Sequence, residues 1–529
     1  MKRGRIGKCM VAGVLTLSMA LTSGAMAVGD GQPSSWAAAE VERAREAGLL
    51  DFEPHSGYQE DITRGEFAGL AVLLAKSLGC PVEELGQDSW QGTPFTDLTA
   101  GTEGVYSAAA WRLGLMNGVS DTTFAPDRTI TRTEICVLLD RVMDVCGVEL
   151  PQTVDGVAER MASGAEGAIP GWAAEGVKNL IGSGLMKGSG DGWQLSAHTT
   201  VEQAALLAVR AMDAGCADLE AKRFTAAERE QIAKLKELRA TFGNPGEPYA
   251  QAPSVEEFIP GKLNDAFLQD ALNALNYVRA VAGLEPVGMR DEKNQEVQLG
   301  ALLLAAGGDE AFSTEPSKPK GMSEDLYRRG SQVVKESMSG REQRDLTEYV
   351  LNRVEDYSIL FMGSGRRWLL DPLLTTVGMG YIDGYSVIQV GNGTSGEWDG
   401  PDYVTWPSAG VFPEELFHDK LGWSCLLKPG VYVNDMEDMD GVAVTVTDGS
   451  GNTWTDQVAE DKESADGAIH INLNDGYVRL NPSYGGTLMV VFHPVGLEYR
   501  TGEPITVTIS GLKLRSGGTD TITYTVKLF

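Results

Sequence analysis

Three apolar segments of helical length lie within the first 215 residues. They begin at Phe67 (FAGLAVLLAKSL), Ile135 (ICVLLDRVMDVC) and Gln203 (QAALLAVRAMDA). Each is long and apolar enough to predict a packed helix. An earlier helix is expected before each of them, because a Gly-Leu turn of the kind that ends helices stands upstream, at Gly48, Gly114 and Gly184.

The pattern changes near residue 263. DAFLQDALNALNYVRAVAGLEPV has helical periodicity, QLGALLLAAGG predicts a second buried helix, and EYVLNRVEDYSILFMGSGRRWLLDP contains a third. VGMGYIDGYSVIQVGN then alternates as strands do. After residue 400 the alternation continues in VAVTVTD, AIHINL, TLMVVFHP, PITVTISGLKL and TITYTVKLF. The pattern therefore predicts a helical front, a mixed middle and an all-β end.

A charged segment connects the front to the middle. Residues 218–242 read DLEAKRFTAAEREQIAKLKELRATF and predict one helix, which serves as a spacer or packs on the third front segment. The following NPGEPYAQAPSVEEFIPGK is rich in Pro and Gly and predicts a loop.

The N-terminus has the pattern of a secretory signal. The basic residues Lys2, Arg3, Arg5 and Lys8 are followed by the apolar run CMVAGVLTLSMAL and by the small-residue site Ala25-Met26-Ala27. We expect cleavage after Ala27 and export of the rest of the chain. No later segment approaches the roughly 20 apolar residues of a transmembrane helix.

Composition restricts the partners. The chain has 529 residues, so several domains are expected, and its net charge is −30, with 74 acidic and 44 basic residues. Nucleic acid and anionic membranes are excluded as partners because they would repel such a surface. Removal of Cys9 leaves Cys80, Cys136, Cys146, Cys216 and Cys425. These are too scattered for a disulfide framework, and free buried thiols are the favoured interpretation.

The three front helices begin alike. Ile62-Thr63-Arg64-Gly65-Glu66 recurs as Ile130-Thr131-Arg132-Thr133-Glu134, and Thr199-Thr200-Val201-Glu202 is a weaker copy. The leading threonines are evenly spaced, since 131 − 63 = 68 and 199 − 131 = 68. Thr-x-x-Glu is a capping box, in which each of the two side chains accepts a hydrogen bond from a backbone amide at the helix start.

This repeated helix–turn–helix unit resembles the S-layer homology (SLH) module. The second copy is the most complete, with FTDL from Phe95, GLMNG from Gly114, TFAP from Thr123 and then ITRTE. The resemblance implies an α-helical trefoil of three modules. It also implies a non-covalent anchor to an anionic, pyruvylated secondary cell-wall polysaccharide, and hence a secreted protein at the cell wall or S-layer surface.

The resemblance further implies which residues contact the glycan. A guanidinium can bind a carboxylate through two parallel hydrogen bonds. Arg64 and Arg132 match the family's arginine, whereas Thr200 stands at that position in the third repeat and predicts a weaker groove. The full expected set is Arg64, Arg132, Thr63, Thr131, Glu66, Glu134, Trp36, Trp111, Trp172 and Gly118. For the threonines and glutamates, helix capping alone is an equally good explanation.

The middle region resembles a different family. GSGRRWLLDP, at residues 363–372, is similar to the G-H-R-R-W-L-L-N-P segment of the bacterial CAP superfamily (SCP-like proteins), and NYVR in the first middle helix matches that family's N-x-x-R. The resemblance implies an α–β–α sandwich. Thr314 and Gly365 stand where the family has its two cleft histidines, so the cleft is expected to be degenerate.

The chemistry of this cleft is restricted by what it lacks. No histidine occurs between His198 and His418, so we expect neither a metal nor a cofactor. Arg366 and Arg367 have two interpretations: one holds an internal carboxylate as a structural staple, or both line a cleft for an anionic or sugar ligand. The carboxylates that could replace the histidines are Glu310, Glu315, Glu324 and Asp325, although solvated surface charges explain them better.

The tail carries a further resemblance. YVTWPSAGVFPEELF contains a W-P-x-x-G-x-F-P segment that often follows the CAP domain in related secreted proteins. The short strands beyond it predict an immunoglobulin-like sandwich. Residues 434–441 (NDMEDMDG) have some character of a calcium loop, but Met436 and Met439 break that frame and favour an acidic hairpin loop.

The sequence thus predicts a multidomain protein with an α-helical SLH trefoil, an α+β CAP-like domain and an all-β immunoglobulin-like sandwich. The expected divisions are 1–27 (signal peptide), 28–90, 91–150 and 151–217 (repeats), 218–261 (helical spacer and linker), 262–395 (CAP-like) and 396–529 (β-rich). The leading hypothesis is a non-enzymatic, wall-anchored surface protein whose CAP-like domain binds or scaffolds an unknown ligand. The alternatives are a hydrolase that uses carboxylates and a carrier of a small apolar ligand.

Overall fold

The computed structural model describes residues 32–52, 57–82, 90–188, 192–308, 316–355, 365–390, 398–417, 422–433, 441–457, 477–482 and 488–529. The expected signal peptide, Thr314 and most of the acidic loop at 434–441 lie outside these residues. The chain divides into two compact units between Lys222 and Arg223, each with its own hydrophobic core.

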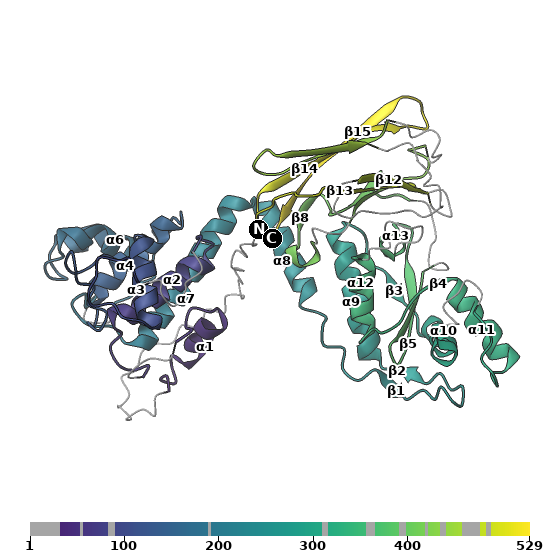
Figure 1. Cartoon of the computed structure of the whole chain (residues 1–529), viewed down its shortest axis with the longest axis horizontal. Helices are drawn as coiled ribbons and strands as arrows, with labels where there is room; N and C mark the ends of the chain where they lie inside the picture. Colours follow the sequence, from purple (N-terminus) through teal and green to yellow (C-terminus); the bar gives the residue numbers. More distant parts are fainter. Residues whose placement is uncertain are drawn as a thin grey trace. The chain divides into compact units, whose positions relative to one another are not determined.

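The front unit is helical, as its apolar pattern predicts (Figure 1). Its helices are α1 (Ala38–Glu46), α2 (Arg64–Ser77), α3 (Thr102–Arg112), α4 (Arg132–Val145), α5 (Val157–Ala162), η1 (Gly171–Ala173), α6 (Ala174–Gly182) and α7 (Val201–Arg223). The three apolar segments form α2, α4 and α7. Their buried residues, among them Phe67, Ile135 and Leu207, belong to one core.

Short backbone bridges join the three repeats into a ring. They pair Thr63 with Thr129, Thr131 with His198, and Asp61 with Thr200. Each bridge lies just before a long helix, so the chain that leads into each helix is paired with a neighbouring repeat. Because the third repeat pairs back to the first, each repeat contacts both of the others.

The connector differs from the single helix expected over residues 218–242. α7 continues out of the third repeat to Arg223, and a separate helix, α8 (Ala226–Arg239), starts after a break. A capping box causes the new start: Thr225 Oγ1 accepts from the Glu228 amide at 3.2 Å, and Glu228 Oε2 accepts from the Thr225 amide at 2.7 Å. Ile232 and Leu235 of α8 are buried in the core of the second unit, so α8 packs there.

Residues 262–390 form three layers (Figure 1). The middle layer is a sheet of order β3-β5-β6-β4, in which β3 and β5 are parallel and the other pairs antiparallel. Helices α9 and α12 lie on one side of it and α10 and α11 on the other. The elements are β1 (Tyr249–Gln251), β2 (Lys262–Leu263), α9 (Asp265–Val281), β3 (Gly288–Met289), α10 (Asp291–Gly307), α11 (Glu324–Lys335), β4 (Ser337–Gly340), α12 (Leu346–Val354), α13 (Gly365–Leu369), β5 (Thr376–Ile382) and β6 (Tyr385–Gln389).

The β-rich end consists of two sheets, of order β11-β10-β14-β15-β8 and β12-β13-β9-β7. Their strands are β7 (Tyr403–Trp406), β8 (Gly410–Phe412), β9 (Trp423–Leu427), β10 (Ala443–Thr447), β11 (Thr453–Gln457), β12 (Tyr477–Pro482), β13 (Leu488–His493), β14 (Pro504–Lys513) and β15 (Thr519–Leu528). The strand patterns VAVTVTD, TLMVVFHP, PITVTISGLKL and TITYTVKLF form β10, β13, β14 and β15, whereas AIHINL lies outside the described residues.

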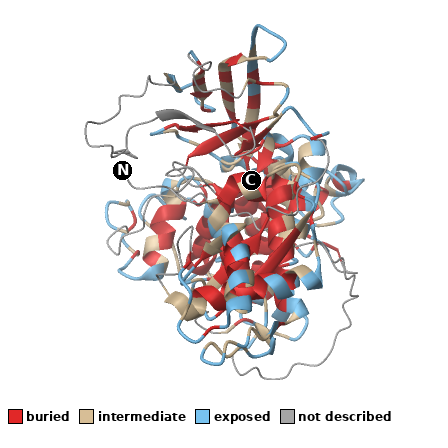
Figure 2. Ribbon diagram, turned by 90° about the vertical axis from the view of Figure 1, so that its right-hand side faces the viewer, coloured by how far each residue is buried: buried red, intermediate tan, exposed pale blue. Residues whose placement is uncertain are grey.

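The α/β region and the β-rich region share one hydrophobic core, although the sequence pattern divides them. The same cluster of buried residues includes Val278 of α9, Val377 of β5, Trp406 of β7, Val490 of β13 and Val507 of β14. Figure 2 shows this burial as continuous red along the inner faces of helices and strands. The boundary expected at residue 395 therefore does not separate two cores.

Within the described ranges, every helix is too short or too polar to cross a membrane.

Candidate functional site

The Thr-x-x-Glu pairs of the first two repeats are capping boxes. Thr63 Oγ1 accepts from the Glu66 amide at 3.1 Å, and Glu66 Oε2 accepts from the Thr63 amide at 2.9 Å. Thr131 and Glu134 make the same two bonds at 3.3 and 2.9 Å. All four polar side chains are therefore engaged in starting α2 and α4.

The third repeat starts one residue later than its sequence pattern indicates. α7 begins at Val201, so its cap is Thr200, whose Oγ1 accepts from the Gln203 amide at 3.4 Å. The expected pairing of Thr199 with Glu202 is wrong. Glu202 instead accepts from the amide and the hydroxyl of Ser34, at 2.8 and 3.0 Å, and so ties the third repeat to the start of the first.

Backbone hydrogen bonds between repeats fix this register independently. The first helical residue of each repeat donates its amide to a neighbouring repeat: Arg64 to Arg128 O, Arg132 to Ala197 O and Val201 to Glu60 O, at 2.8, 2.9 and 3.0 Å. Val201, not Thr200, therefore occupies the position of the arginines. The third junction therefore has an apolar valine where the other two junctions have an arginine.

Arg64 is buried at the junction of the first and second repeats. Its side chain is 6% exposed, and it donates from Nε to Phe124 O at 3.1 Å and from Nη2 to Asn117 O at 2.8 Å. The guanidinium also lies over the Phe124 ring, 5.1 Å from its centroid. Burial lowers the pKa of Arg64 below its usual value. These contacts make Arg64 a clamp between repeats.

Arg132 repeats this geometry at the next junction but is less buried. It donates from Nε to Trp193 O at 3.0 Å and from Nη2 to Lys187 O at 2.7 Å. Its Nη1 hydrogen-bonds to no residue within the described part of the chain. Burial lowers the pKa of Arg132 as well. Arg132 thus links two repeats through Nε and Nη2, and its Nη1 could donate to another acceptor.

A carboxylate holds each loop that the arginines contact. Asp97, from the FTDL segment, accepts from the amides of Phe124 and Ala125, the latter at 2.6 Å. Burial opposes ionisation of Asp97, but these amide bonds outweigh it and lower the pKa of that carboxyl. In the third repeat, Glu166 accepts from the Trp193 amide at 2.6 Å and so takes the place of Asp97.

The three tryptophans do not share one environment. Trp172 and Trp36 are 62% and 46% exposed, as ligand-stacking rings would be. Trp111 is half-buried and packs edge-on against Phe95, 5.7 Å between centroids. Gly118 is required by space, since a β-carbon there would lie 2.4 Å from the Phe95 ring and 2.5 Å from Ser120 O.

In the second unit, a buried arginine holds the backbone of the segment GRRWLLDP. Arg279 of α9, the arginine of NYVR, is 1% exposed. It donates from Nη1 to Leu369 O and Asp371 O, at 2.8 and 3.0 Å, and from Nη2 to Leu374 O at 3.4 Å. NYVR and GRRWLLDP therefore hydrogen-bond to each other: NYVR supplies the guanidinium of Arg279, and GRRWLLDP supplies the carbonyl oxygens of Leu369 and Asp371.

Arg366 performs a second structural role. It is 2% exposed and donates to Val354 O and Gly422 O, both at 2.7 Å, and to Ser424 Oγ at 3.4 Å. It holds backbone carbonyls of both the α/β and the β-rich regions. Arg367 is also buried, with its guanidinium 6.0 Å from the centre of the Trp368 ring, and burial lowers its pKa.

Gly365 lies where a side chain has little room. A β-carbon there would be 2.8 Å from Cβ and 3.0 Å from the carbonyl oxygen of Arg353. A histidine at this position would have to displace α12, to which Arg353 belongs. Thr314 and the carboxylates Glu310 and Glu315 lie outside the described residues.

The remaining carboxylates near the expected cleft are ion-paired on the surface. Glu324 lies 2.7 Å from Lys318 Nζ, and Asp325 lies 3.0 Å from Arg328 Nη2. Both acidic side chains are more than 60% exposed. Their setting is that of solvated surface charges.

A groove that sequence reasoning missed lies between α10, α11 and the sheet. It has a volume of about 490 Å³. Its charged and polar lining is Arg290, Glu292, Lys293, Glu296, Arg328, Arg329, Gln332, Glu336, Thr376 and Gln389. Burial lowers the pKa of Lys293, which donates to Thr376 O at 3.4 Å. The helical spacing of the α10 and α11 charges was the only signal of this groove in the sequence.

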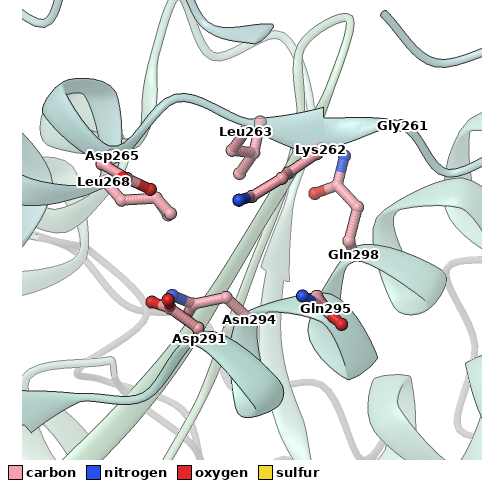
Figure 3. A pocket seen from close by; sticks show the side chains of 9 residues that line it. All are labelled: Gly261, Lys262, Leu263, Asp265, Leu268, Asp291, Asn294, Gln295 and Gln298. Atoms are coloured by element: carbon pink, nitrogen blue, oxygen red, sulfur yellow. The ribbon is translucent and has the colours of Figure 1, made fainter. Parts of the chain in front are cut away.

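A smaller cavity lies where β2 passes over α10 (Figure 3). Its volume of about 30 Å³ suits water rather than an organic ligand. Asn294 lines it and is 5% exposed; its Oδ1 accepts from the Met379 amide at 2.9 Å, while its Nδ2 finds no hydrogen-bond partner among the described residues. Water in this cavity would satisfy that amide.

Comparison with known families gives one match. Residues 108–136 match the S-layer homology domain, and this stretch runs from α3 through the capping box of α4. Searches of curated proteins and of solved structures gave no match. An SLH domain is therefore present in the second repeat.

Proposed function

We propose that this chain is a secreted surface protein, and that its front unit anchors it non-covalently to an anionic secondary cell-wall polysaccharide. The observation that carries the proposal is the matched SLH stretch at 108–136. Two further units with the same cap and the same amide bond between repeats stand beside it in the ring. On this basis all three repeats are SLH modules, and the polysaccharide is their ligand.

Within the ring, the junction of repeats 2 and 3 is the proposed principal site. Arg132 has an unengaged Nη1 and partial exposure, so it can donate to a carboxylate of the glycan while it keeps its two carbonyl bonds. The exposed ring of Trp172 supplies a surface on which a sugar could stack. Arg64 is the weaker candidate because burial leaves it little access to a polymer.

For the second unit we propose a binding or scaffolding role within a CAP-like fold. The groove between α10 and α11 supports binding, since its lining combines the cations Arg290, Lys293, Arg328 and Arg329 with the carboxylates Glu292, Glu296 and Glu336. This mixed lining suits a ligand that carries several hydroxyl groups. The two alternatives, a carboxylate-based hydrolase and an apolar carrier, find less support in a groove with this lining.

The anchoring proposal is tested by co-sedimentation of the full chain with cell walls of the source organism. Untreated walls should retain the protein, and walls stripped of secondary polysaccharide should not. Arg132→Ala should weaken retention roughly tenfold or more, since a hydrogen bond to a charged group is worth about 1.5–3 kcal/mol. Arg500→Ala, which removes an exposed arginine of the second unit outside the groove, is the matched control. Equal retention on stripped walls would refute the glycan assignment.

A further inference from the structure

Two cysteines of different repeats meet in the front unit. Cys80 follows the end of α2, and Cys146 is the cap residue at the end of α4. Their sulfur atoms are 2.6 Å apart. All four of Cys80, Cys136, Cys146 and Cys425 are free thiols, but Cys80 and Cys146 are partly exposed whereas Cys136 and Cys425 are completely buried.

The backbone holds both cysteines in place. The Cys80 amide donates to Ala75 O and the Cys146 amide to Val142 O, both at 3.0 Å, so each residue continues the hydrogen bonding of its helix end. Formation of a bond of about 2.0 Å needs an approach of only about 0.6 Å by the two sulfurs.

We propose that Cys80 and Cys146 are a site of disulfide formation, and that the resulting bond covalently links the first and second repeats of the exported protein. Disulfides persist in oxidising compartments outside the cell, where the expected signal sequence would deliver this chain. The inference goes beyond the anchoring function and does not depend on it. It departs from the expectation of free buried thiols, which Cys136 and Cys425 meet.

The chemistry balances with an external disulfide as the oxidant. The Cys80 thiolate attacks one sulfur of that disulfide and releases its other half as a thiolate. The Cys146 thiolate then attacks the Cys80 sulfur and releases the second half. Two electrons pass from the cysteine pair to the oxidant, and the two cysteine protons end on the released thiols. Either sulfur can donate in the hydrogen bond between them, so Cys146 can equally attack first, and the balance of atoms and electrons is then the same.

The bond would brace the junction that Arg64 clamps. Arg64 joins the start of α2 to the second repeat, and Cys80 would join the end of α2 to the end of α4. α2 would then be fixed to the second repeat at both of its ends. Oxidation would therefore stabilise the ring at the junction where an arginine is most deeply buried.

The test is peptide mapping of the exported full chain, purified without reductant and denatured in the presence of an alkylating agent. We expect a peptide pair joined through Cys80 and Cys146, lighter by two hydrogens than the two thiol peptides, which separates after treatment with dithiothreitol. If both cysteines are recovered as alkylated thiols, even after incubation with oxidised glutathione, the proposal is wrong. A bridge from either cysteine to Cys216 would overturn it equally.

Thermal unfolding gives a second readout. Reduction should lower the melting temperature of the front unit by roughly 5–10 °C in the natural sequence. Cys80→Ser and Cys146→Ser should each start lower and lose less on reduction, whereas Cys425→Ser, in the second unit, should leave the front-unit response unchanged. An identical response in all four proteins would contradict a stabilising bond between Cys80 and Cys146.

Discussion

At the scale of single residues, the arginines of the repeats are clamps before they are ligand contacts. Arg64 and Arg132 each satisfy two backbone carbonyls of the next repeat. A guanidinium offers five N–H donors, so two structural bonds still leave donors for a ligand if solvent can reach them. Exposure therefore decides which arginine could also serve the proposed glycan site, and it favours Arg132.

Arg64→Ala should destabilise the front unit by about 3 kcal/mol, because it removes two charge-assisted hydrogen bonds and leaves two inter-repeat carbonyls without a partner. Arg132→Ala should cost less, since water can reach its site. Urea unfolding followed by circular dichroism measures both values. Arg64→Lys, which keeps the charge but not the planar fork, should fall between the natural sequence and the alanine variant. A cost at Arg132 equal to that at Arg64 would contradict the role of burial.

The lowered pKa of Asp97 predicts that the loop at Phe124 and Ala125 loses stability in acid. The amides of Phe124 and Ala125 lower its pKa relative to the unfolded chain, so it adds stability above the unfolded value of about 3.9 and loses it as pH falls through the lower folded value. Melting curves from pH 7 to pH 2 should show Asp97→Asn less stable than the natural sequence at neutral pH. The difference should begin to shrink below about pH 4 and disappear only when the pH has passed below the lower folded value. Asp121→Asn, at an exposed site of the same repeat, should track the natural sequence throughout.

At the scale of elements, the caps decide where helices begin. Thr131→Ala should destabilise the front unit by about 1 kcal/mol, the usual cost of losing a threonine cap. Thr200→Ala should cost less, because the Thr131 hydroxyl also donates to the Glu134 carboxylate at 3.2 Å, whereas the partner of Thr200 is the neutral Gln203. Denaturant midpoints of the two variants, with Thr131→Ser as the conservative control, measure the difference. A larger loss at Thr200 would contradict this ranking.

The same caps explain how far the sequence alone could lead. Periodicity and Thr-x-x-Glu predicted α2 and α4 correctly, since local hydrogen bonds define those starts. The start of α7 was misplaced by one residue, because a second threonine and a glutamate offered a false box and only pairing with Glu60 and Tyr58 of the first repeat fixes the register. The break between α7 and α8 carried the same signal, Thr225 with Glu228, within a segment interpreted as one helix.

Long-range contacts were beyond what the pattern could reveal. The segment GRRWLLDP is visible in the sequence. The sequence does not indicate that the carbonyls of this segment bind Arg279, about ninety residues earlier. The groove at α10 and α11 and the approach of Cys80 to Cys146 likewise depend on how elements pack. Spacing along the chain carries no information about such distances.

At the scale of the whole molecule, contacts within the second unit cross the boundary expected at residue 395. Arg366 bonds to Gly422 and Ser424 across the expected boundary. An ion pair joins α8 to the last strand, β15: Lys527 Nζ lies 3.0 Å from Glu228 Oε1. The Tyr277 hydroxyl of α9 donates to Glu415 at 2.8 Å. The first helix and the last strand of this unit are therefore tied together.

These contacts predict the behaviour of fragments. Residues 223–529 should fold alone, with a cooperative thermal transition and near-ultraviolet circular dichroism like that of the full chain. Residues 262–395 alone should not, because Arg366 would lose its partners at Gly422 and Ser424 and the apolar faces of α9 and β5 would lose the β-rich half of their shared core. Residues 240–529, which lack α8 but keep both regions, are the matched control, and they should fold with reduced stability since Ile232 and Leu235 are missing from the core. A cooperative, native-like transition in 262–395 would establish an independent middle domain and contradict the shared core.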